Sequence, residues 1–207
     1  MSTAASTDTK EQILDVAERV IAKRGFAGTT LRSVVSQAGV NLAAVHYHFG
    51  SKEELYRATV SRLARPVVEY ATKHLEQLQA QTSVPPLEGI LTIFLMSSLT
   101  LVMGDESSQM VRAQFMGRCR TEPEPIQNIS RQEFEPCSQI LLDALQRALP
   151  DQSRSQLAWK LDLAIAVLIR VQMEAGKPGA LIQSSQPEDI QKAVSHLVTF
   201  LAAGMRS

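Results

Sequence analysis

Side chains that could bind the phosphates and base edges of DNA are concentrated between residues 29 and 55. Hydroxyl, imidazole, phenol and cationic groups recur there among small apolar residues. Polar groups of these kinds hydrogen-bond phosphate oxygens or base acceptors, and a small side chain such as Ala43 permits close approach to a thymine methyl group. The candidate DNA-contacting residues are Thr30, Arg32, Leu42, Ala43, His46, Tyr47, His48 and Lys52. This chemistry requires a scaffold that presents one helix to the major groove.

The pattern around these residues predicts a helix-turn-helix. Thr30 and Asn41 are suitable N-caps for helices over about 31–38 and 42–49, and Gly39 can adopt the positive φ of a sharp turn. The apolar residues expected to form its small core are Val34, Val35, Ala38, Val40, Val45 and Phe49. The candidate base-contacting side chains then lie on the opposite face of the second helix, which would enter the groove.

Apolar residues recur at spacings of three and four along nearly the whole chain, with breaks at Gly and Pro. No segment alternates with period two, so the sequence predicts an all-α protein of about nine helices. The expected helices span about 8–24, 31–38, 42–49, 52–80, 87–103, 106–120, 126–149, 153–175 and 187–203, after an unstructured N-terminal tail. Ser51 and Glu54 form a capping-box pattern at the fourth helix, which Pro66 should kink or interrupt. We divide the chain into a helix-turn-helix domain over 1–51, a connecting helix over 52–80 and a helical body over 81–207.

The charge distribution agrees with DNA binding at one end only. The 207 residues have a net charge of zero, but residues 1–66 contain nine Lys/Arg and six Asp/Glu, whereas the remainder is acidic. There is no run of about 18 apolar residues and no signal-peptide pattern, so we expect a cytoplasmic protein without a membrane span. Cys119 and Cys137 form no metal motif and are expected to be free thiols, with a redox-sensing pair as the alternative.

Motifs for catalysis are missing from the sequence. It contains no HExxH motif, no glycine-rich loop that would hold phosphates, and no plausible set of nucleophile, base and acid. His74 and His196 lie on expected helices without a metal-spaced partner. We therefore expect no enzymatic activity, no catalytic residue, no metal and no cofactor.

The string GVNLAAVHYHFGSKEEL closely resembles the DNA-binding motif of the TetR family of bacterial transcriptional regulators, and the resemblance extends over about residues 10–63. It implies that Thr30, Arg32, Tyr47, His48 and Lys52 contact phosphates, and that Leu42, Ala43 and His46 face bases. Family members commonly have Tyr where this chain has His46. The recognition helix also contains no Lys or Arg, so phosphate contacts and dimer spacing should contribute much of the specificity.

The resemblance also implies that the body binds an effector and forms a homodimer through the eighth and ninth helices. Candidate effector-binding residues are Phe94, Met103, Arg112, Phe115, Arg118, Phe134 and Trp159; the alternative is ordinary core packing and solvated arginines. A lipophilic or acyl-CoA-like effector is expected. The predicted function is a regulator, with repression as the simpler mode, that leaves a palindromic operator in double-stranded DNA when the effector binds. The alternative is a helical binding module that is regulated by a protein partner.

Overall fold

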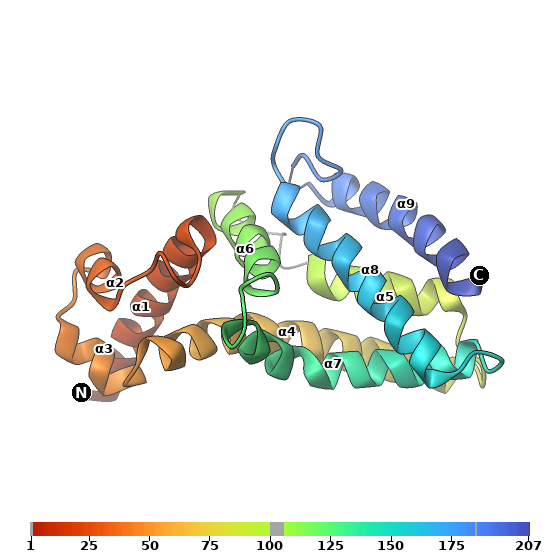
Figure 1. Ribbon diagram of the computed structural model, residues 1–207, viewed down its shortest axis with the longest axis horizontal. Helices are drawn as coiled ribbons and strands as arrows, with labels where there is room; N and C mark the ends of the chain where they lie inside the picture. The colour runs from red at the N-terminus through yellow and green to blue at the C-terminus, as the bar shows by residue number, and fades with distance from the viewer. Residues whose placement is uncertain (1, 100–105, 185) are drawn as a thin grey trace.

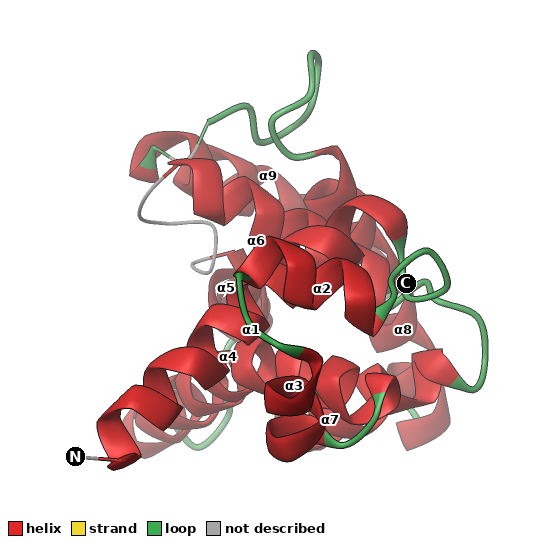
Figure 2. Cartoon of the chain, turned by 90° about the vertical axis from the view of Figure 1, so that its left-hand side faces the viewer, coloured by secondary structure: helices red, strands yellow, loops and turns green. Residues whose placement is uncertain are grey.

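The computed structural model describes residues 2–99, 106–184 and 186–207, and every regular element within those ranges is a helix (Figures 1 and 2). The helices are α1 (Ser2–Arg24), α2 (Leu31–Ala38), α3 (Leu42–Phe49), α4 (Lys52–Gln81), α5 (Leu87–Leu99), α6 (Glu106–Cys119), α7 (Ile126–Ala148), α8 (Arg154–Glu174) and α9 (Pro187–Arg206). The predicted all-α class and the number of helices are therefore confirmed for the described part of the chain.

Local capping interactions define the helix-turn-helix. The Thr30 side chain accepts a hydrogen bond from the backbone of Ser33 at the start of α2, and the Asn41 side chain accepts one from Ala44 at the start of α3. Gly39 ends α2 in the left-handed region, with φ of 65°. An L side chain rarely adopts this conformation, so glycine permits the sharp turn that directs α3 away from α2.

Helix α4 connects the two ends of the molecule. It leaves the small group formed by α1, α2 and α3 and continues beside α7 along the body (Figure 1). Helix α6 packs against α1 on one side and against α8 on the other, and α5 packs against α9. The helix-turn-helix end and the body therefore meet at α4 and α6.

Some predicted boundaries differ from the structure. Helix α1 begins at Ser2, where no unstructured tail is present, because no Gly or Pro in residues 2–24 opposes helix formation. Helix α4 passes through Pro66 without interruption; Pro66 is exposed, so solvent can hydrate the carbonyl group that lacks its usual N–H partner. At Ser51 the side chain accepts a hydrogen bond from Glu54, which is one half of the expected capping box.

The apolar stripe of α9 is part of the protomer's own core. Ile190, Val194, Leu197 and Leu201 are all buried, and α9 packs against α5. The sequence suggests a dimer contact through these side chains and Val198, of which only Val198 is half-buried in the protomer. The exposed large apolar side chains on the last two helices are instead Trp159, Leu163 and Phe200.

Candidate nucleic-acid interface and body cavity

The predicted recognition face of α3 is open to solvent. Tyr47 is 83% exposed and Leu42 is 36% exposed, and Ala43 and His46 are also exposed. Val45 and Phe49 point the other way and are buried. The structure thus brings the candidate base-contacting residues together on one surface, as the helical periodicity predicts.

His46 is held by its own helix end. Its Nδ1 lies 2.8 Å from the carbonyl oxygen of Gly50, and because a carbonyl can only accept, Nδ1 donates this hydrogen bond. In the neutral ring Nε2 is then an acceptor, which would pair with a donor on a base edge rather than with a base acceptor. This tautomer changes the sequence-based expectation, in which His46 donates.

The candidate phosphate-contacting residues surround α3. Thr30 and Arg32 are exposed at the start of α2, while His48 is half-buried between the rings of Tyr47 and Phe49. The ammonium group of Lys52 lies 4.1 Å from the centroid of the Phe26 ring, a cation–π contact that restrains it beside the N-terminus of α4. A lysine at such a helix end can add its charge to free backbone N–H groups around a phosphate.

Phe26, in the turn between α1 and α2, is attached to the body. Its backbone N–H donates a hydrogen bond of 2.8 Å to the buried carboxylate of Glu122, in the loop between α6 and α7. Its ring meets the ring of Tyr56 edge-on, with centroids 5.3 Å apart. The same aromatic ring therefore contacts Lys52 on the DNA side and Tyr56 on the body side.

Tyr56 continues this connection into the body. Its hydroxyl donates a 3.2 Å hydrogen bond to the carbonyl of Cys119, and the Ser130 hydroxyl donates a 2.7 Å bond to the same oxygen. Burial raises the pKa of the Tyr56 phenol, so that it remains a neutral donor. The end of α6, the start of α7 and the DNA-binding end are thereby joined by buried hydrogen bonds.

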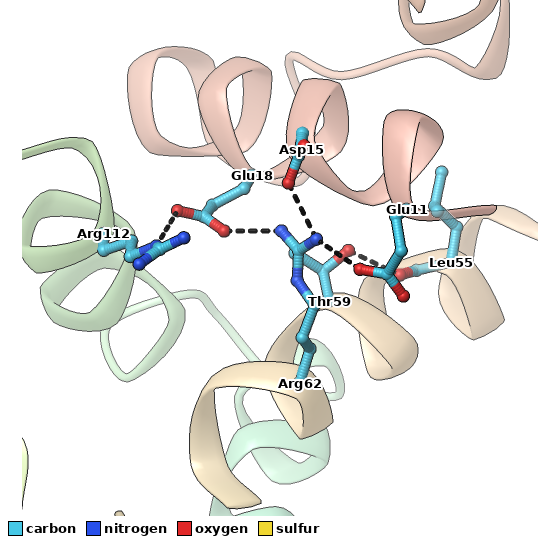
Figure 3. Close-up of polar contacts among 7 residues, drawn as sticks. All are labelled: Glu11, Asp15, Glu18, Leu55, Thr59, Arg62 and Arg112. Atoms are coloured by element: carbon cyan, nitrogen blue, oxygen red, sulfur yellow. Dashed lines mark hydrogen bonds and ion pairs between the residues drawn. The ribbon is translucent and has the colours of Figure 1, made fainter. Parts of the chain in front are cut away.

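An ion-pair network makes a second connection, in which Glu18 of α1 lies between two arginines (Figure 3). Arg62 of α4 contacts Glu11, Asp15 and Glu18 at 3.1, 2.8 and 2.7 Å, and Arg112 of α6 lies 3.6 Å from Glu18. Burial raises the pKa of Glu18, which Arg62 and Arg112 oppose and Asp15 reinforces. Three helices are thus held together by one buried carboxylate.

The body contains a cavity of about 470 Å³ between α7 and α8. Apolar side chains from both helices line it, among them Phe134, Leu161, Ile165 and Ile169. Arg120 also lines it, with its guanidinium carbon 4.2 Å from the centroid of the Phe134 ring. The volume of this cavity lies in the range of sites that bind small organic molecules.

Few of the predicted effector-binding residues line this cavity. Phe134 does, and Met103 lies outside the described residues. Phe94 and Phe115 are buried elsewhere in the core, Arg112 pairs with Glu18, and Trp159 is 60% exposed. Arg118 lies near the turn at Gly25: a Cβ atom added to this glycine would lie 3.1 Å from the Nη1 atom of Arg118. Large apolar residues are not distinguishable as core or cavity by type alone, because both environments exclude water.

Several functional candidates gave no clear signal in the sequence. Arg120 looks like an ordinary helix-end arginine, and Glu122 lies in a proline-containing loop. Tyr56 and Ser130 are 74 positions apart, and nothing in their local pattern indicates that they meet.

Cys119 and Cys137 are free, buried thiols. Burial raises the pKa of each thiol to about 11, so neither is a reactive thiolate near neutral pH. The described residues contain no cluster of His, Cys, Asp or Glu that could hold a metal ion. No helix in that part of the chain is long and apolar enough to cross a membrane.

Two family models match the chain. Residues 13–59 match the model for bacterial regulatory proteins of the tetR family, and residues 92–204 match the model for the tetracyclin repressor-like C-terminal domain. The HTH-type transcriptional repressor BepR of Brucella suis is 27% identical over 168 residues, which cover 80% of this chain and 78% of BepR. The regulator TtgR of Pseudomonas putida is 43% identical, but over 56 residues, 27% of each chain.

Solved structures show the same fold. FadR of Bacillus subtilis, solved in complex with stearoyl-CoA, superimposes with a TM-score of 0.69 at 14% identity over 94% of this chain and 98% of FadR. NalD of Pseudomonas aeruginosa, a repressor of a multidrug efflux pump, gives 0.64 at 19% identity over 97% and 96%. The helix-turn-helix geometry and both family models lead to one conclusion: the chain belongs to the TetR family and is a transcriptional regulator, not an enzyme.

Proposed function

We propose that this protein is a ligand-responsive repressor that binds a palindromic operator as a homodimer and leaves it when a small molecule occupies the cavity between α7 and α8. The observation that carries the proposal is a continuous series of contacts from the cavity to the DNA-binding face. Ser130 lines the cavity and shares the Cys119 carbonyl with Tyr56, which packs on Phe26. Phe26 in turn holds Lys52.

The proposed division of work follows the boundaries expected from the sequence. Residues 1–51 read DNA, residues 52–80 connect, and residues 81–207 bind the effector and dimerise. On the DNA side, α3 presents Leu42, Ala43 and His46 to bases. Thr30, Arg32, Tyr47, His48 and Lys52 hold the phosphates on either side of the groove.

Dimerisation would involve α8 and α9. Trp159 and Leu163 are exposed one turn apart on α8, and Phe200 is 66% exposed on α9. Large apolar side chains gathered at a surface are typical of protein interfaces, and a twofold contact would cover them in both protomers. Binding of a palindromic operator requires the dimer to hold two copies of α3 about 34–36 Å apart, the spacing of successive major grooves on one side of DNA.

Release requires the effector to bind one arrangement of the protomer better than the other. A molecule between α7 and α8 that moves Ser130 changes the hydrogen bonds at the Cys119 carbonyl and therefore the position of Tyr56. Because Glu122 and Tyr56 both hold Phe26, the turn between α1 and α2 moves with the end of α6. The spacing of the two recognition helices then no longer matches the operator.

A regulator controlled by a protein partner is the second candidate. The exposed apolar side chains of α8 and α9 could bind such a partner instead of a second protomer. The cavity favours the small molecule, because a hollow of about 470 Å³ that opens to the surface between α7 and α8 has the size of a small-molecule site.

The test is selection of bound fragments from genomic DNA, followed by gel-shift titration of the recovered sequence. We expect a palindromic site, bound at least about a thousandfold more tightly than random DNA. His46→Ala should reduce that ratio, whereas Tyr47→Ala should weaken binding to both DNAs equally. Recovery of no preferred sequence would contradict the proposal.

A further inference from the structure

Arg120 is a cation without a counterion in the wall of the body cavity. Its Nη1 atom is buried and has no hydrogen-bond partner, while the residue as a whole is half-buried, and no carboxylate in the described part of the chain pairs with its guanidinium group. Buried charges in proteins are normally paired, because an uncompensated charge loses its hydration. The guanidinium carbon lies over the Phe134 ring, and this cation–π contact compensates the loss only in part.

The neighbouring charges do not neutralise Arg120. The other ionisable side chains that line the cavity are Arg131, Glu135 and Asp162. Arg131 pairs with Glu124 at 3.3 Å, while Glu135 and Asp162 are exposed to solvent. Arginine does not lose its proton in proteins, so the Arg120 guanidinium stays charged without a direct partner, although the lining as a whole has no net positive charge.

We infer that the effector is a small organic carboxylate whose anionic group binds the Arg120 guanidinium and whose apolar part lies against Phe134, Leu161 and Ile165. The inference rests on the proposed function and specifies the ligand of the same cavity. A guanidinium fork matches the two oxygens of a carboxylate, and the cation–π contact with Phe134 restrains the group in the cavity wall. The exposed carboxylates of Glu135 and Asp162 disfavour ligands with more negative charge, which makes a monocarboxylate the matching species.

The position of Arg120 also connects the anion to the DNA-binding end. Arg120 directly follows Cys119, whose carbonyl accepts the hydrogen bonds from Tyr56 and Ser130. The Arg120 carbonyl itself accepts a 2.8 Å hydrogen bond from the side chain of Gln127 on α7. An anion that draws the guanidinium group into the cavity therefore acts on the segment that carries the contacts to Phe26.

The first experiment measures binding by isothermal titration calorimetry with the full-length protein. Octanoate, decanoate and benzoate are compared with octanol, decanol and benzyl alcohol, which match them in shape but are neutral. We expect at least one acid to bind about tenfold or more tightly than its alcohol, as a charged hydrogen bond requires. Arg120→Gln should remove that preference and Arg120→Lys should restore part of it. Arg147→Gln, which changes an exposed arginine in the last turn of α7 outside the cavity lining, should preserve it.

Thermal unfolding of each variant verifies that it folds. If Arg120→Gln does not fold, Arg120→Lys still tests the inference. Equal affinity for acids and alcohols, no binding of any acid, or an unchanged preference in a folded Arg120→Gln would overturn the inference. A gel-shift experiment distinguishes failure of the carboxylate inference from failure of the proposed function. If acids and alcohols release DNA equally, the proposed function stands and the carboxylate inference fails. If the protein binds no operator, the proposed function fails, while calorimetry still decides the role of Arg120.

Discussion

The carboxylate of Glu122 accepts a hydrogen bond from the backbone N–H of Phe26 at 2.8 Å, across 96 positions of sequence. This bond attaches the turn before the helix-turn-helix to the loop between α6 and α7. Glu122 is buried, so the bond is protected from competition with water. We therefore expect a movement of the α6–α7 loop to displace the turn at Phe26.

Glu122→Ala should uncouple effector binding from DNA release. The Phe26 N–H loses its partner, which costs about 1–3 kcal/mol of stability, and the loop can then move without the turn. In gel-shift titrations we expect the effector-induced loss of operator affinity to decrease more than operator affinity itself. Glu124→Ala is the matched control, because Glu124 lies in the same loop and forms an exposed ion pair with Arg131. Equal responses of both variants to the effector would contradict the coupling role.

Lys52→Ala should weaken operator binding and reduce its dependence on salt. Loss of one phosphate contact lowers the slope of log affinity against log salt concentration by about 0.9 per half-site. The measurement is a series of binding titrations at several salt concentrations. Lys192→Ala is the control, since Lys192 is an exposed lysine on α9 with the same charge. If both variants kept the wild-type slope, Lys52 would not be a phosphate contact.

Trp159→Asp should dissociate the proposed dimer. A carboxylate in the centre of an apolar contact between protomers would be buried without a counterion, which is strongly unfavourable. Sedimentation velocity should show monomer where the wild-type protein is dimeric, and operator affinity should fall because two half-sites are no longer bound together. Val84→Asp, at an exposed valine in the loop after α4, should leave the dimer intact. A dimeric Trp159→Asp protein would place the interface elsewhere.

The relative stability of Glu18→Gln and the wild-type protein should depend on pH. Burial raises the pKa of Glu18 above its ordinary value of 4.5, so the folded protein retains this proton at a pH where the unfolded chain has released it. Wild-type stability therefore falls as the pH rises from 4.5 through the raised value, whereas glutamine has no proton to release. Urea unfolding at stepwise pH should show Glu18→Gln gaining stability relative to wild type over that range. A difference that is constant, or that favours wild type increasingly as pH rises, would contradict the burial effect.

Short-range interactions explain why the helix-turn-helix could be predicted from the sequence alone. The caps at Thr30 and Asn41 act over three residues, and the positive φ of Gly39 is a property of one residue. The spacing of Val45 and Phe49 also determines which face of α3 is buried and which presents Tyr47 to solvent. Such features depend on the local chain, so residue type and spacing determine them.

The tertiary structure alone decided which groups meet across the molecule. The sequence did not indicate that the α9 stripe is internal, that Glu18 joins two arginines, or that Arg120 lies unpaired over Phe134. These contacts connect helices distant in sequence, and their partners are set by how whole helices pack. A buried leucine or arginine has the same local pattern in a core as in a cavity wall. Only the packed structure determines whether it has a partner there, because packing decides which side chains lose contact with water.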